Sequence, residues 1–191
     1  MTRASGLLVA LALAACGAAS PAAPPSDDAV ATWAGADSQF RTILARLVFS
    51  TQTLPMATYA LGIPESCAII RPAFDKAIAT NLPAWRTNLA KAYRDNVPAA
   101  TLAEAVAAGP SGVARIQPYV PKVGASMQAA STPILERAAD AVLIAAMNAT
   151  TKVDPKSVDG AARMQQLKAA QADGSMFCGL MGRDETKRSV N

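Results

Sequence analysis

Residues 122–149, KVGASMQAASTPILERAADAVLIAAMNA, form the longest apolar pattern in the chain and decide its fold class. Apolar side chains recur there at helical spacing, Met127, Ile134 and Val142 among them, which places them on one face of a helix. We therefore expect this segment to be the central helix of the protein. Pro133 lies inside it, and its ring either bends the helix or splits it in two.

The rest of the chain repeats this pattern over shorter stretches. Apolar residues recur at helical spacing over residues 40–48 and again over residues 82–93. Ser66 is expected to cap a helix that runs to about residue 80 and is kinked or delayed by Pro72. Pro83 marks the start of a second helix, which we expect to end near residue 96.

The composition also favours helices. The chain has 191 residues, of which 51% are hydrophobic, 17% charged and only 5% aromatic. It can bury a sizeable core in one domain, and its large share of Ala favours closely packed helices over sheets. We therefore expect an all-α fold, an irregular bundle of five to seven helices. The basic residues are scattered singly instead of forming a stripe, so we expect no nucleic-acid partner.

The N-terminus has the features of an export signal. A basic start precedes an apolar run over residues 7–13, which is too short to cross a bilayer as a permanent helix. Residues 13–16, LAAC, resemble the lipobox of bacterial lipoproteins, in which the cysteine accepts lipid and becomes the mature N-terminus. We expect residues 1–15 to be removed and Cys16 to be lipidated. The alternative is a plain secretory signal cut near residues 18–19.

The residues after the signal predict a location and a domain plan. Gly17 stands where lipoproteins retained in the inner membrane would carry Asp, so we expect a periplasmic protein anchored by Cys16 to the inner leaflet of the outer membrane. Residues 16–28 combine the lipid anchor with a Pro/Ala-rich tether, since proline-rich chain stays extended. Residues 29–181 would form the helical domain, and the charged residues 182–191 a flexible tail.

The cysteine count suggests a disulfide. Once Cys16 carries lipid, Cys67 and Cys178 remain in a compartment that oxidises thiols. We expect them to pair and to close a loop of about 110 residues, for which chain entropy gives about 4–5 kcal/mol of stability. Two separate buried thiols are the alternative.

Residues 85–147 resemble a known family. In order they carry a helix with a Trp and a Tyr (WRTNLAKAY), a capped short helix (TLAEAV), a GPSG turn, a proline-bounded step (QPYVPKV) and a long Ala-rich helix. This order is DUF2059-like: it resembles the domain of unknown function numbered 2059, a helical family of exported bacterial proteins. The family's short helix usually ends in an aromatic pair, whereas residues 106–108 here are Val, Ala and Ala. The resemblance implies no activity. It implies structural roles for Trp85, Tyr93 and Gly112, two rings in a core and a glycine in a tight turn, or else a groove lined by the rings.

The sequence lacks the residues of the common catalytic sites. There is no histidine, which removes the usual general base, the usual metal ligand and every Ser-His or Cys-His pair. No phosphate-binding, dinucleotide or nucleophile-elbow motif is present. Glu104 remains, and Glu136 lies one helical turn from Asp140, but a solvated charged face explains that pair because Arg137 neighbours it. We expect no catalytic residue, no metal and no cofactor.

Three functions fit these observations. The first is a non-catalytic interaction or accessory module of the cell envelope, with membrane lipid and an envelope protein as partners. The second is a carrier of a small apolar ligand, which predicts a cavity of several hundred Å³ between helices. The third is a cell-wall hydrolase, which predicts a cleft with two carboxylates. The residues expected to line the ligand cavity are Phe74, Trp85, Tyr93, Met127 and Met147.

Overall fold

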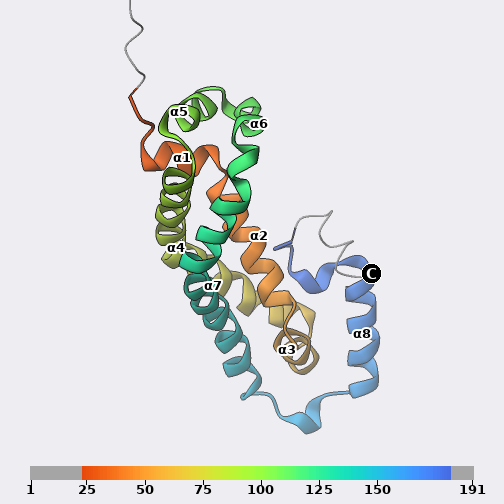
Figure 1. Cartoon of the computed structure of the whole chain (residues 1–191). Coiled ribbons are helices and arrows are strands. Elements are labelled where there is room, and N and C mark those ends of the chain that lie inside the picture. Colours follow the sequence, from red (N-terminus) through yellow and green to blue (C-terminus); the bar gives the residue numbers. More distant parts are fainter. Residues whose placement is uncertain (1–22, 182–191) are drawn as a thin grey trace, which may run out of the picture.

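A computed structural model describes residues 23–181 of the chain (Figure 1). The predicted signal segment, Cys16, the first part of the tether and the predicted tail lie outside the described residues. Within residues 23–181 the chain is helical and has no strand, which confirms the all-α prediction. Seven helices have seven residues or more, and α6 is a single turn. The helices are α1 (Asp27–Trp33), α2 (Ala36–Phe49), α3 (Thr53–Leu61), α4 (Ile63–Asn96), α5 (Ala99–Ala107), α6 (Val113–Ile116), α7 (Val120–Thr150) and α8 (Gly160–Asp173).

The long helices α4 and α7 pack along each other and form the axis of an elongated bundle (Figure 1). Helices α1, α2 and α3 pack against this pair, α5 and α6 lie at one end, and α8 returns beside α3. The fully buried side chains come from all the long elements, including Phe40 of α2, Phe74 of α4 and Val142 of α7. Burial of these apolar side chains is the main favourable contribution to the fold.

The central helix is confirmed, because α7 covers the predicted residues 122–149 without a break. Pro133 lies inside it and does not split it. Its ring removes the hydrogen bond to the carbonyl of Ala129, and both residues are exposed, so water can bind that carbonyl instead.

The two helices predicted between residues 66 and 96 are in fact one helix, α4. Pro72 and Pro83 both lie inside it, yet their rings are exposed, as are Ala68 and Ala79, whose carbonyls lose their helical donors. Solvent can satisfy those carbonyls, and packing against α7 and its neighbours outweighs the cost of the two rings. Ser66 is therefore not an N-cap; it lies buried inside the helix.

The first helix begins inside the segment predicted as the tether, residues 16–28. Helix α1 starts at Asp27, and the hydroxyl of Ser26 accepts a hydrogen bond of 3.2 Å from the backbone N–H of Ala29. This N-cap marks the start of the first helix of the described chain. Gly35, with φ 72°, then separates α1 from α2, since a left-handed backbone suits glycine.

The predicted disulfide joins Cys67, near the start of α4, to Cys178, after the last helical turn of the described chain. The two Cα atoms lie 5.2 Å apart, the usual separation for such a bond. Arg71 Nε donates a hydrogen bond of 2.7 Å to the carbonyl of Cys178. Because Ala170 is the only buried residue that α8 contributes, the disulfide is a principal link between this C-terminal segment and the bundle.

Gly112 is needed for close packing, which differs from the expected role in a tight turn. Its φ is −69°, a value open to any residue, but a Cβ there would lie 2.0 Å from the carbonyl oxygen of Ala105. The left-handed residue of this connection is Gly109, with φ 62°. Despite the length of α4 and α7, no helix within residues 23–181 has a stretch apolar enough to span a bilayer.

Candidate functional site

A groove of about 420 Å³ lies between α2, α4 and α7. Helix α2 contributes Gln39 and Ile43 to its wall. Helix α4 contributes Trp85, Leu89 and Tyr93, which are spaced by four residues and so lie on one face of the helix. The volume falls within the range of about 300–1,000 Å³ that is typical of small-molecule sites.

Helix α7 forms the opposite wall of the groove. Its contribution repeats every three or four residues from Val120 to Leu135, so the groove follows the first half of this helix. The wall includes Gly124, where a Cβ would meet no other atom within 4 Å. A larger side chain at position 124 would therefore extend into open space.

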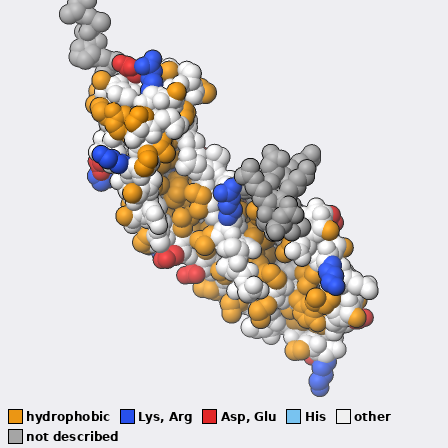
Figure 2. All heavy atoms as spheres, turned by 45° about the vertical axis from the view of Figure 1, so that its right-hand side comes forward, with side chains coloured by type: hydrophobic (Ala, Val, Ile, Leu, Met, Phe, Trp, Pro, Cys, Tyr) orange, Lys and Arg blue, Asp and Glu red, His pale blue; other side chains and the backbone are white. Residues whose placement is uncertain are grey.

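The lining of the groove carries no formal charge. Apart from apolar side chains it contains the amides Gln39 and Gln128, the hydroxyls Ser131 and Thr132, and the polar atoms of Trp85 and Tyr93. On the face shown in Figure 2, hydrophobic side chains extend from one end of the molecule to the other, with single or small groups of Lys, Arg, Asp and Glu side chains among them. An uncharged, largely apolar wall favours an uncharged ligand, because a charge loses its hydration there without gaining a partner.

Three of the five predicted groove residues, Trp85, Tyr93 and Met127, line this groove together. The other two, Phe74 and Met147, do not line it. Phe74 is fully buried in the core, where the guanidinium of Arg41 lies 5.6 Å from its ring centroid. Met147 is 54% exposed and follows Met127 by 20 residues, about 30 Å along a helix that rises 1.5 Å per residue.

Trp85 is the most buried aromatic side chain of the groove. It is only 4% exposed, and its ring centroid lies 5.3 Å from that of Phe40. Among the described residues, its indole Nε1 finds no hydrogen-bond partner. Trp33 differs in this respect, since its Nε1 donates a hydrogen bond of 2.8 Å to the carbonyl of Gly109. Buried indole N–H groups usually have a partner, so the free donor of Trp85 calls for an explanation.

Tyr93 lies at the same face of α4, two turns beyond Trp85. Its ring meets that of Trp33 edge to face, with centroids 5.6 Å apart. The side chain is half-buried, and burial raises the pKa of its hydroxyl because the phenolate is poorly solvated there. Neutral tyrosine is thus favoured at the groove.

The buried hydroxyl of Ser131 is already partnered. Its Oγ accepts a hydrogen bond of 3.3 Å from the amide of Asn88 and lies 3.9 Å from the sulfur of Met127. Ser131 itself is 1% exposed. It therefore helps to fix α4 against α7 and leaves the Trp85 indole as the unsatisfied buried donor of the site.

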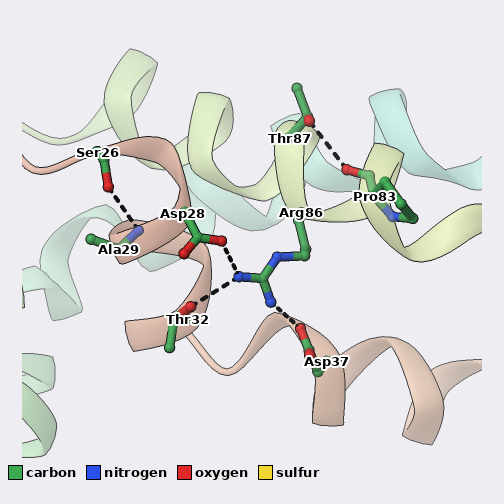
Figure 3. Close-up of polar contacts among 8 residues, drawn as sticks. All are labelled: Ser26, Asp28, Ala29, Thr32, Asp37, Pro83, Arg86 and Thr87. Atoms are coloured by element: carbon green, nitrogen blue, oxygen red, sulfur yellow. Dashed lines mark hydrogen bonds and ion pairs between the residues drawn. The ribbon is translucent and has the colours of Figure 1, made fainter. Parts of the chain in front are cut away.

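The residue after Trp85 faces a different environment. Arg86 donates hydrogen bonds of 2.5 Å to Asp28 and 2.9 Å to Thr32 of α1, and it also contacts Asp37 of α2 (Figure 3). The hydrogen bond to Asp28, followed by that to Asp37, raises the pKa of the guanidinium above its ordinary value. This cluster joins three helices, and we call it the Arg86 cluster.

A second arginine fastens the start of the domain to α4. Arg94 donates a hydrogen bond of 2.7 Å to the carbonyl of Pro25 and lies 2.9 Å from Asp27. Neither arginine's role could be predicted from the sequence, because Arg86 and Arg94 bind residues 49 to 69 positions away. Both arginines hold α1 in place, and Arg86 also lines a pocket of about 400 Å³ together with Asp27 and Asp28.

The carboxylates considered for hydrolysis do not meet in a cleft. Glu104 pairs with Arg115 at 3.0 Å on the surface of α5 and α6. Glu136 and Asp140 are exposed on α7, and neither they nor Glu104 line the groove. Within residues 23–181, no group of three or more His, Cys, Asp or Glu side chains is placed to hold a metal ion.

Comparison with known proteins adds no relative: no protein-family model, curated protein or solved structure matches the chain. The protein can therefore be classified only by its own structure. The described residues form an all-α domain in which an open, uncharged groove runs along the long helices α4 and α7.

Proposed function

We propose that this chain is a lipid-anchored protein of the periplasm that binds a small apolar ligand in the groove between α2, α4 and α7 without transforming it. Cys16 would hold it to the inner leaflet of the outer membrane. Of the three functions considered above, this is the carrier. The observation that supports it is the groove of about 420 Å³ with a lining free of formal charge.

The position of the groove suits a tethered protein. Arg94 holds Pro25 against the end of α4, so the tether leaves the domain near Tyr93, which lines the groove. The described chain begins at the same end of the bundle as α5 and α6 (Figure 1). A lipid-anchored N-terminus would thus keep the groove close to the membrane, the main source of apolar molecules in the envelope.

The other two functions have less support. A hydrolase would need two carboxylates facing one cleft, and the carboxylates considered for it are exposed or paired elsewhere. An interaction module would need an apolar surface with a defined partner. The exposed Ile144 and Met147 lie one helical turn apart on α7, but they give no indication of a partner's chemistry. An envelope protein partner and the DUF2059-like relationship stay predictions.

The groove can be tested by filling it. We would titrate the purified full chain with N-phenyl-1-naphthylamine, an uncharged apolar dye whose fluorescence rises when it leaves water. Gly124→Leu places a side chain in the open part of the groove, and it should reduce dye affinity at least tenfold by occupying the space that the dye needs.

Ala125→Leu provides the matched control. It adds a leucine of the same size to the neighbouring residue of α7, which is exposed and outside the groove lining. Dye affinity should stay within about twofold of the unchanged chain. Equal dye binding by Gly124→Leu and the unchanged chain, with both folded, would contradict the proposed ligand site.

The anchor needs a separate measurement. The intact mass of the protein isolated from the envelope should correspond to a chain that begins at Cys16 and carries acyl groups. A chain cut after residue 18 or 19, or one that retains Met1, would remove the lipid anchor from the proposal while leaving the groove untouched.

A further inference from the structure

On the basis of the proposed function, we infer that the ligand is an uncharged amphiphile, an apolar chain or ring system that presents a neutral hydrogen-bond acceptor to the indole N–H of Trp85. Two independent observations support this ligand class. One is the uncharged lining of the groove, and the other is the buried Trp85 donor, which has no hydrogen-bond partner within residues 23–181.

The lining selects against charge. A carboxylate or an ammonium group inside the groove would lose its hydration shell and find no opposite charge among the lining residues. Arg86, the residue after Trp85 on α4, already has its charge balanced by Asp28 and Asp37, and it also donates to Thr32. An anionic ligand therefore has no counter-ion available from this cluster.

The Trp85 indole selects for an acceptor. Indole has one N–H group and can only donate, so its partner must be an oxygen or nitrogen lone pair. The hydroxyl of Ser131 accepts from Asn88 and not from Trp85, and no other described group accepts from the indole. A carbonyl or amide oxygen of the ligand would satisfy the Trp85 donor, which no described residue does.

Access to the indole requires a side chain to move. Trp85 is 4% exposed, so a ligand must displace a neighbour to reach its Nε1. Met127 lines the same groove and is 8% exposed, and methionine is unbranched, with three rotatable bonds. Met127 is therefore the lining side chain with the most freedom to move aside when a ligand enters.

Three ligands of equal chain length test this inference: decanamide, decanoate and decylammonium. Each is titrated against the full chain loaded with N-phenyl-1-naphthylamine at pH 7, and dye displacement is measured. We expect decanamide to displace the dye at a concentration at least tenfold lower than either charged ligand. In Trp85→Phe the ratio between the displacing concentrations of the charged ligands and of decanamide should fall about fivefold to tenfold. This is the loss expected for one hydrogen bond.

A second readout covers the case in which Trp85→Phe does not fold. In Trp33→Phe the remaining tryptophan is Trp85, so its emission reports the indole directly. Decanamide should shift that emission to longer wavelength, as hydrogen bonding to an indole does, and decanoate should not.

The possible failures can be told apart. Absence of dye binding by the unchanged chain would overturn the proposed ligand site itself. Dye binding with equal displacement by all three ligands, or an unshifted Trp85 emission with decanamide bound, would overturn the assignment of an uncharged acceptor ligand and leave the groove as a site for apolar molecules in general.

Discussion

Two neighbouring residues of α4 lie in opposite environments. Arg86 faces α1 and α2, where it donates to two carboxylates and a hydroxyl, while Trp85 lines the groove with a buried donor that no described residue accepts. Polar groups that only hold a fold together are usually satisfied within it. The difference therefore separates a structural face of α4 from a face that is available to a ligand.

The disulfide should show that global stability and ligand binding are separate properties. Replacing both Cys67 and Cys178 with Ser should lower the free energy of unfolding by about 2–5 kcal/mol, because the loop that they close is long. Chemical denaturation measures this change. Dye affinity should not change in the folded protein, since neither cysteine lines the groove; a parallel loss of affinity would show that the two faces are not independent.

The Arg86 cluster should affect stability without affecting binding. Arg86→Met keeps the apolar stem but removes the hydrogen bonds to three residues, so we expect the free energy of unfolding to fall by about 1–2 kcal/mol. Dye affinity should stay within about twofold of the unchanged chain. A large loss of dye affinity in folded Arg86→Met would place the cluster in the ligand site.

Arg94→Met serves as the matched control for that variant. Arg94 is more exposed than Arg86, 44% against 24% of the side chain, and exposed ion pairs contribute about 0–1 kcal/mol. Arg94→Met should therefore lower the free energy of unfolding by less than Arg86→Met does. Raising the salt to about 1 M, where the Debye length is about 3 Å, should weaken the exposed Arg94 pair more than the Arg86 cluster.

Tyr93 should give the smallest effect, and only in alkaline solution. Burial raises the pKa of its hydroxyl, so above the ordinary tyrosine pKa of about 10 the unfolded chain ionises first. Stability from this residue is complete below about pH 10 and is lost as the pH rises through the folded pKa. In Tyr93→Phe the free energy of unfolding should fall by roughly a few tenths of a kcal/mol less at alkaline pH than it does in the unchanged chain. Urea titrations at pH 8 and pH 10.5 measure it, and identical pH dependence in both proteins would contradict the raised pKa.

The sequence predicted what local patterns determine. The periodic apolar residues placed α7 within two residues at its start and one at its end, and the cysteine count gave the disulfide. The spacing of Trp85 and Tyr93 placed both rings on one face of α4. These features depend on helical periodicity or on simple chemistry, which a single chain contains in full.

The sequence could not predict the features that depend on which face of a helix is exposed to solvent. Pro72 and Pro83 were expected to interrupt α4, and they do not because both rings point outward. Phe74 has the same spacing signal as Trp85, but only the packing of neighbouring helices determines that one lies in a closed core and the other at a groove. The partners of Arg86 come from α1 and α2, and the spacing of residues along α4 does not predict them.

The most direct test uses the two indole N–H signals of the full chain in a proton–nitrogen NMR spectrum. Trp33 donates to Gly109 and is satisfied, whereas Trp85 is not, so Trp33 is a control within the same molecule. On addition of decanamide we predict a concentration-dependent shift of the Trp85 signal and an unchanged Trp33 signal. Bound decanamide with an unshifted Trp85 signal would contradict the account.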